Sequence, residues 1–151
     1  MNFLRSSAAL LSLGCALVAA AQSAPPAPAS APNPLAAAQV FAYEQMPVRT
    51  MANGGEGRNV VSGTLATGES VNVHESMQPA GATPNPAHRI QHSEFIVVQQ
   101  GTLEFIHDGK TERATAGSVI YVAFGTLHGV KNVGDVPAKY IVIAIGGDIE
   151  K

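Results

Sequence analysis

The sequence predicts an all-β domain, and three observations support that prediction. Val, Ile and Thr are frequent in the second half of the chain, where Gly recurs at intervals, a composition typical of strands and turns. Short runs that alternate between apolar and polar residues are separated by turns every ten residues or so, roughly the spacing found in sandwiches and barrels. After residue 58 no apolar pattern has the helical period of about 3.6 residues.

Length and charge limit the organisation of the chain and its partners. The chain has 151 residues, with 9 basic and 11 acidic side chains and a formal net charge of −2, which suits a single domain. It has no basic run, which argues against a nucleic-acid partner. Because Cys15 is the only cysteine, a disulfide framework is excluded.

Residues 1–21 have the features of a secretory signal peptide. Arg5 precedes an apolar core over residues 8–21, and the small residues at its end predict cleavage after Ala21. We therefore expect a periplasmic or secreted protein. No stable membrane span is expected after cleavage, because a span needs roughly 20 apolar residues. Two alternatives stay open, an uncleaved N-terminal anchor and a lipoprotein attached through Cys15.

Residues 22–38 are rich in Ala, Pro and Ser, which predicts a disordered linker. The β-barrel domain is expected to occupy residues 39–151. Its first part, Val40 to Arg49, has a mixed pattern and is expected to form an N-terminal strand or arm that packs on the barrel or on a second subunit.

The remaining strands follow in order from the alternation of side chains and from the turns between them. Asp108-Gly109 separates two alternating runs and predicts a tight hairpin. Pro79 to Pro86 forms a stiff loop, because proline fixes φ. The last strand is apolar on both faces and is expected to be covered on both. The expected strands are 59–65, 70–77, 102–107, 110–114 and 138–145.

Three of the candidate metal-binding residues lie in the stretch from His88 to Gly101. If it is extended, alternate side chains share a face. Two imidazoles and a carboxylate then lie among aliphatic side chains, where an unpaired charge would be costly. A metal ion removes this cost, because His and Glu are common metal ligands. The residues on this face are His88, Ile90, His92, Glu94, Ile96 and Val98.

A second stretch, Gly117 to Asn132, contains an apolar strand, a glycine turn and His128. Together the two stretches resemble the paired motifs of the cupin superfamily. The first motif reads Gly, five residues, His-x-His, three or four residues, Glu, six residues, Gly. The second reads Gly, five residues, Pro-x-Gly, two residues, His, three residues, Asn. The resemblance covers roughly residues 58–147, and the positions that match are His88, Glu94, Gly101, Gly117, Gly125, His128 and Asn132.

Three positions depart from these motifs. Gly81 lies one residue too far from His88, and Ala123 replaces the proline of the second motif. Most importantly, Ile90 stands where the second histidine of His-x-His is expected. His92 lies on the same face by parity, either as a replacement ligand or as a residue that orients Glu94.

The resemblance implies a small jelly-roll barrel with a mononuclear divalent transition metal, which could be Fe, Mn, Ni, Cu or Zn. The implied ligands are His88, Glu94 and His128, with His92 completing the set. Two histidines and one carboxylate leave positions open for a substrate, as in non-haem iron oxygenases. The other two histidines are not expected among the ligands. His107 is expected at the surface, and His74 lies one position off the Val71/Val73 face.

Three functions are compatible with this reading. The first is a metal-dependent enzyme acting on a small molecule at the barrel mouth, such as a dioxygenase, an isomerase or a decarboxylase. The second is a non-catalytic module that binds a small ligand with weak or no metal binding, for which Ile90 is the argument. The third is a structural scaffold. Single-domain cupins commonly form homodimers, and Val40 to Arg49 is the candidate for an exchanged edge strand.

Overall fold

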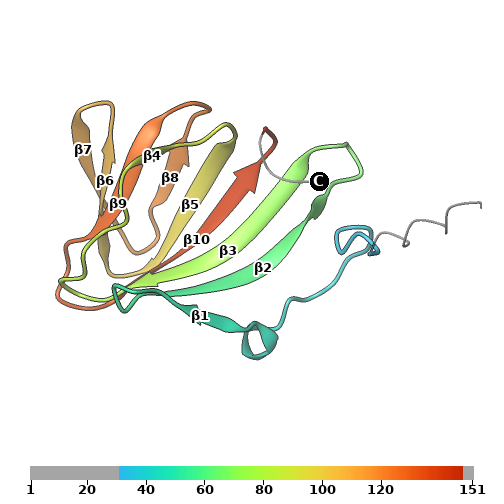
Figure 1. Cartoon of the computed structure of the whole chain (residues 1–151), viewed down its shortest axis with the longest axis horizontal. Helices are drawn as coiled ribbons and strands as arrows, with labels where there is room; N and C mark the ends of the chain where they lie inside the picture. Colours follow the sequence, from blue (N-terminus) through green and yellow to red (C-terminus); the bar gives the residue numbers. More distant parts are fainter. Residues whose placement is uncertain (1–30, 148–151) are drawn as a thin grey trace, which may run out of the picture. The chain divides into compact units, whose positions relative to one another are not determined.

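The computed structural model describes residues 31–147 (Figure 1). The expected signal peptide, the expected linker up to residue 30 and the last four residues of the expected domain lie outside the described residues. The described part contains one short 3-10 helix and ten strands. They are η1 (Tyr43–Gln45), β1 (Val48–Thr50), β2 (Glu56–Thr64), β3 (Ser70–Gln78), β4 (His88–Arg89), β5 (Ser93–Gln100), β6 (Thr102–His107), β7 (Lys110–Thr115), β8 (Val119–Val122), β9 (Leu127–Asn132) and β10 (Ala138–Ile145).

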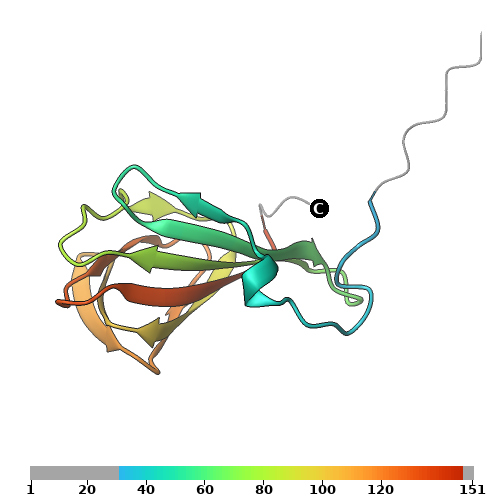
Figure 2. The ribbon, with the colours of Figure 1, turned by 90° about the horizontal axis from the view of Figure 1, so that it is seen from below.

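The strands form two antiparallel sheets (Figures 1 and 2). One has six strands in the order β1-β2-β3-β10-β5-β8, and the other has four in the order β4-β9-β6-β7. The apolar core lies between these sheets. This arrangement confirms the predicted all-β jelly roll. Within residues 31–147, no helix is long and apolar enough to cross a membrane.

Several elements have the bounds and turns that the sequence predicts. Strand β6 covers 102–107 and β10 covers 138–145. Asp108 and Gly109 both have positive φ, 45° and 75°, as a tight turn with two left-handed residues requires. Strand β10 lies in the middle of its sheet, between β3 and β5, and every second residue of β10 is buried.

The stretch from His88 to Gly101 differs from the prediction, because it is not one strand. Strand β4 pairs with β9 in the four-stranded sheet, whereas β5 pairs with β10 and β8 in the six-stranded sheet. The chain crosses between the sheets at residues 90–92. The carbonyl of Ile90 accepts a hydrogen bond from the Gly125 amide in this crossing (3.0 Å). Glu94 and His88 therefore reach the barrel interior from opposite sheets.

The segment before β2 packs against the sheet. Asn33 donates a side-chain hydrogen bond to the Thr64 carbonyl and accepts one from the Thr64 amide, at 2.6 and 3.2 Å. Within Val40 to Arg49 the structure forms η1 and the start of β1, and β1 pairs with β2 of the same chain.

Candidate functional site

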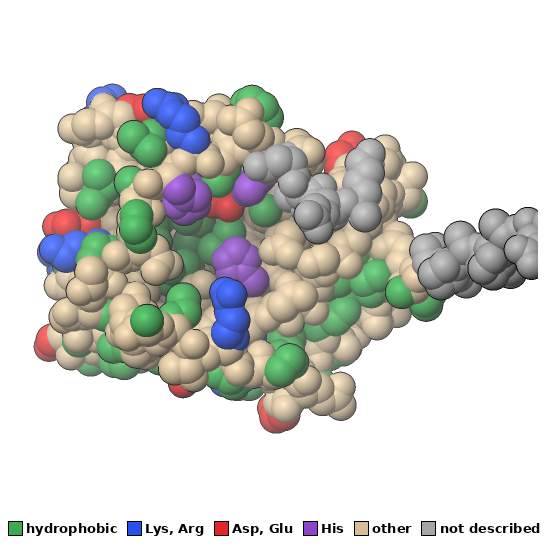
Figure 3. Space-filling view, in the orientation of Figure 1, with side chains coloured by type: hydrophobic (Ala, Val, Ile, Leu, Met, Phe, Trp, Pro, Cys, Tyr) green, Lys and Arg blue, Asp and Glu red, His purple; other side chains and the backbone are tan. Residues whose placement is uncertain are grey.

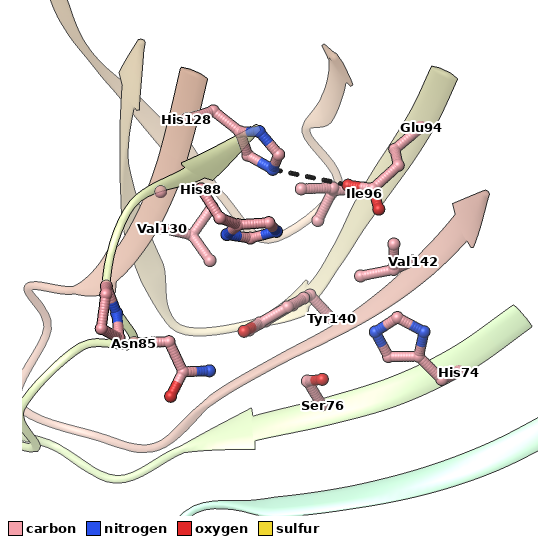
Figure 4. Close-up of a pocket in the computed structure, with 12 residues that line it drawn as sticks. His74, Ser76, Asn85, His88, Glu94, Ile96, His128, Val130, Tyr140 and Val142 are labelled. Atoms are coloured by element: carbon pink, nitrogen blue, oxygen red, sulfur yellow. Dashed lines mark ion pairs between the residues drawn. The ribbon is translucent and has the colours of Figure 1, made fainter. Parts of the chain in front are cut away.

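A cavity of about 140 Å³ lies between the two sheets. Histidine side chains gather around the hollow on this face of the molecule, with acidic and basic side chains beside them (Figure 3). Strands β3, β5 and β10 line one side of the cavity, and β4 and β9 line the other (Figure 4). Its polar lining residues are His74, Ser76, Asn85, His88, Glu94, His128 and Tyr140.

Glu94 is the buried acid of this site. It lies near the start of β5, and 7% of its surface is exposed. Each of its carboxylate oxygens faces an imidazole. Oε1 is 2.9 Å from His92 Nε2, and Oε2 is 3.5 Å from His128 Nε2. Burial raises the pKa of Glu94, but hydrogen bonds and positive charge from His128 and His92 outweigh it, so the pKa lies below its ordinary value.

His128 is held by the strand that carries it. It is 3% exposed, and its Nδ1 donates a hydrogen bond to the Thr126 carbonyl at 3.3 Å. The other ring nitrogen, Nε2, faces the Glu94 carboxylate (Figure 4). A proton or a cation between Nε2 and the carboxylate would be held by both groups.

His88 lies beside His128 because β4 and β9 place the two residues opposite each other. Their ring centroids are 4.7 Å apart, and the rings are tilted by 48°. His88 is exposed at the mouth of the cavity, whereas His128 is buried. The four predicted ligands therefore gather at one end of the barrel, around Glu94.

The donor set fits a divalent transition metal in its chemistry. Two ligands that are about 2.0–2.2 Å from one metal ion lie roughly 3–3.5 Å apart, and the separation of His128 Nε2 from Glu94 Oε2 is within this range. As the side chains are placed, however, no group of three or more His, Cys, Asp or Glu residues within 31–147 is arranged to hold a metal ion. His88 or His92 would have to turn toward the Glu94–His128 pair to complete a site.

Ile90, at the position of the missing histidine, belongs to the apolar core. It is 4% exposed and packs in the buried cluster that includes Ile96 and Val98. Position 90 therefore carries an apolar side chain where the cupin motif has a histidine that can bind a metal.

His74, which the sequence does not place among the ligands, lines the cavity. It lies directly opposite Val142 on β10, and Val142 lies opposite Ile96 on β5, so all three point into the barrel. The polar face of β3 is thus the inner face, although a polar face beside Val71 and Val73 resembles a solvent-exposed one. The signal that the interpretation missed is an unbroken polar stripe of Ser70, Asn72, His74, Ser76 and Gln78.

A short hydrogen-bond chain fixes the His74 ring. Asn72 Nδ2 donates to Ser62 Oγ at 2.6 Å, so Asn72 Oδ1 is free to accept from His74 Nδ1, at 3.2 Å. The pKa of His74 lies below its ordinary value, and burial is the main cause. The negative charge of Glu94 raises this pKa, and the positive charge of Arg49 lowers it. His74 is therefore neutral at pH 7, with its lone pair on Nε2.

Asn132 and Gln78 connect strands β9, β3 and β10 through hydrogen bonds. Asn132 Nδ2 donates to the carbonyls of Gln78 and Val136, at 3.0 and 2.8 Å. Gln78 Nε2 donates to the Tyr140 hydroxyl oxygen at 3.0 Å. Burial raises the pKa of Tyr140 above its ordinary value, so the hydroxyl keeps its proton at neutral pH. Asn132 therefore serves the backbone of the barrel, and Tyr140 presents a hydroxyl to the cavity.

Comparisons with known proteins agree with this architecture. The family model described as Cupin domain matches residues 73–144. A comparison with curated protein sequences finds no match. Solved structures with a similar fold include an RmlC-like cupin from Shewanella frigidimarina, with 20% identity and a TM-score of 0.59 over 74% of this chain and 94% of that one.

Two further similar structures carry an activity in their descriptions. One is a sugar phosphate isomerase of the cupin superfamily, from Silicibacter pomeroyi. It has 17% identity and a TM-score of 0.60, over 70% of this chain and 74% of that one. A predicted oxalate decarboxylase of Thermotoga maritima has 18% identity and a TM-score of 0.55, over 71% of this chain and 98% of that one. At these identities the likeness shows the fold alone.

The two facing antiparallel sheets, the histidines and glutamate at the barrel mouth and the match over residues 73–144 lead to one assignment. Residues 73–144 form a cupin domain.

Proposed function

We propose that this protein binds one divalent transition metal ion and a small molecule at the mouth of its barrel. Glu94 and His128 would hold the metal, with His88 and His92 as further ligands. The observation that supports this most strongly is the buried pair of His128 Nε2 and Glu94 Oε2, 3.5 Å apart. Both atoms can act as ligands of one cation that lies between them.

The proposed activity is metal-assisted conversion of a small molecule, of the dioxygenase or isomerase type. Fe, Mn, Ni, Cu and Zn all suit imidazole and carboxylate ligands, and a bound ion would supply Lewis acidity. The side chains around the metal ligands would hold the substrate. Tyr140 can donate a hydrogen bond from its hydroxyl, and the neutral His74 can accept one at Nε2. Ile96 and Val142 give the cavity an apolar wall.

A second candidate function is a ligand-binding module that needs no metal. Two observations favour it. Ile90 is built into the core in place of a ligand, and hydrogen bonds from His92 and His128 already compensate the Glu94 charge. In this case the barrel mouth would bind a small molecule without turnover.

Metal content separates the two candidates. The protein without residues 1–21 would be purified without chelators or a histidine tag, reconstituted with each metal, desalted and analysed by elemental mass spectrometry. We expect about one ion per chain, lost in the His88→Ala/His128→Ala double variant. The control is His107→Ala, because His107 contacts Glu112 outside the cavity (2.8 Å). Absence of metal from the reconstituted parent would support the second candidate instead.

We also propose that the chain is secreted to the periplasm through residues 1–21, on the evidence of the sequence alone. The mass of the protein recovered from the periplasmic fraction after expression of the full chain should correspond to residues 22–151. A product that retains Met1 and sediments with membranes would support an anchor.

We further propose that two copies pair through the outer face of β5 and β8. Phe95 and Tyr121 lie opposite each other there, with ring centroids 5.2 Å apart. Both are exposed, as is Val119, and exposed apolar patches of this kind mark association surfaces. Light scattering after gel filtration should give a dimer for the parent and a monomer for Tyr121→Lys. A monomeric parent would refute the proposal.

A further inference from the structure

We propose that a second chamber, next to the metal cavity, binds an oxyanion group of the small molecule, a carboxylate or a phosphate, through Arg49. This inference rests on the proposed function and specifies its ligand. The chamber has a volume of about 560 Å³ and is bounded by residues of β1, β2 and β3. It shares His74, Ser76 and Asn85 with the smaller cavity, so one ligand can extend from one chamber into the other.

The register of the six-stranded sheet places Arg49 on the face that lines the barrel. Arg49 lies opposite Gly57, Gly57 lies opposite Ser76, and Ser76 lies opposite Tyr140. Residues directly opposite one another in a sheet point to the same side. Arg49 therefore continues the row of Ser76 and Tyr140 beyond the barrel mouth.

The Arg49 side chain lies beside Gly57 in this row. A Cβ at position 57 would lie 4.0 Å from Nη2 of Arg49. Arg49, Gly57 and Ser76 all line the chamber.

Arg49 is the chamber's uncompensated positive charge. The other arginine there, Arg58, lies 3.9 Å from the carboxylate of Glu56 and 3.7 Å from that of Glu75. It also donates to the Met46 carbonyl (3.2 Å) and covers the Tyr43 ring. Within residues 31–147, no carboxylate oxygen lies within 4.0 Å of Arg49. The guanidinium fork is suited to a carboxylate or a phosphate group.

The two chambers thus have opposite charge. The smaller holds the Glu94 carboxylate, and the larger holds the guanidinium of Arg49 beside the paired charges of Arg58 and Glu75. His74 lies between them and experiences both fields, because Glu94 raises its pKa and Arg49 lowers it. The amides of Asn59 and Asn85 also line the larger chamber, and both residues are exposed. A ligand with an anionic end at Arg49 and a neutral polar end near Glu94 matches this distribution.

Binding of simple anions tests the inference. Inorganic phosphate, succinate and uncharged succinamide would be titrated into the ¹⁵N-labelled protein at low salt, and backbone amide shifts followed by NMR. We expect phosphate or succinate to shift the amides of Gly57, Ser76 and Asn85, and succinamide to have no effect. Comparison of phosphate with succinate identifies which oxyanion the chamber prefers.

The variants are matched in charge. Arg49→Gln should weaken anion binding at least fivefold, and Arg49→Lys should retain part of it. Arg113→Gln removes the same charge from exposed strand β7, outside the chamber, and should stay within twofold of the parent. Equal anion affinity in Arg49→Gln and the parent would overturn the inference. So would the absence of anion-induced shifts in the parent, or shifts confined to another surface.

Metal content measured on the same samples distinguishes the two proposals. Arg49→Gln should keep the metal of the parent, because Arg49 is not among the proposed ligands. A parent without metal whose anion binding depends on Arg49 would refute the metal site and leave the chamber in place. A parent with metal whose anion binding does not depend on Arg49 would refute the chamber alone.

Discussion

At the scale of single residues, Glu94 organises the site through the two histidines that face its oxygens. His92 contacts Oε1 and His128 faces Oε2. The short His92 contact, 2.9 Å, has the length of a direct hydrogen bond. The longer His128 separation is the one that suits two ligands of a common ion. The two histidines should therefore differ in their importance for the metal.

Replacement of each histidine measures this difference. We expect His128→Ala to abolish tight metal binding. His92→Ala should reduce affinity by about ten- to a hundredfold, the usual effect of removing a residue that orients a ligand. Isothermal titration with the retained metal compares the two. An equally complete loss in His92→Ala would make His92 a full ligand in place of the missing histidine, whereas unchanged affinity would exclude any contribution.

Ile90 offers the complementary test. Ile90→His restores the motif but places an imidazole in the apolar cluster of the core. We expect the metal-free variant to lose about 1–3 kcal/mol of unfolding free energy in urea, because a buried polar group lacks a partner there. Metal affinity should not rise, because Ile90 does not line the cavity. Tighter metal binding with unchanged stability would show that the side chain at position 90 reaches the ligands.

His74 gives the site a pH dependence. Its pKa is lowered mainly by burial, so between that lowered value and the ordinary value of about 6.5 the unfolded chain binds a proton that the folded chain does not. Stability should therefore fall as the pH is lowered through this window. Urea unfolding at several pH values should show a smaller loss in His74→Gln. Identical pH profiles would contradict the assignment of a neutral, buried imidazole.

At the scale of elements, the spacing of the motifs was enough to predict which residues gather at the barrel mouth. It could not predict the break between β4 and β5, because alternation alone cannot show where an extended chain passes from one sheet to the other. Alternation alone also could not show which face of β3 lines the barrel. The environment of that face is a polar cavity, and its formation depends on strands β9 and β10, which are distant in sequence.

Two glycine turns test how the strands are joined. Gly101 and Gly109 both have positive φ, 79° and 75°. A Cβ at Gly101 would lie 2.8 Å from Ala138 Cα, whereas one at Gly109 would meet no atom within 4 Å. Gly109→Ala should cost about 1–2 kcal/mol from backbone strain alone. Gly101→Ala should cost more than about 2 kcal/mol, since it adds a clash with the backbone. Equal unfolding free energies in urea would contradict this packing.

At the scale of the whole molecule, the barrel separates a packed end from a polar mouth. The buried cluster around Leu103 and Val122 fills one part of the space between the sheets, and Gln78 and Asn132 connect the strands through buried hydrogen bonds. Because this frame fixes β5 and β9, the Glu94 carboxylate and the His128 imidazole are held close together before any ligand binds. Such preorganisation is what a metal or ligand site requires.

The most direct test of the metal site is a crystal structure of the protein loaded with the metal that it retains, with an anomalous difference map measured at the absorption edge of that metal. The proposed site predicts one strong peak within coordinating distance of Glu94 and His128, with His88 or His92 turned toward it. A cavity without a peak, or a peak only at the surface pair of His107 and Glu112, would contradict the metal site.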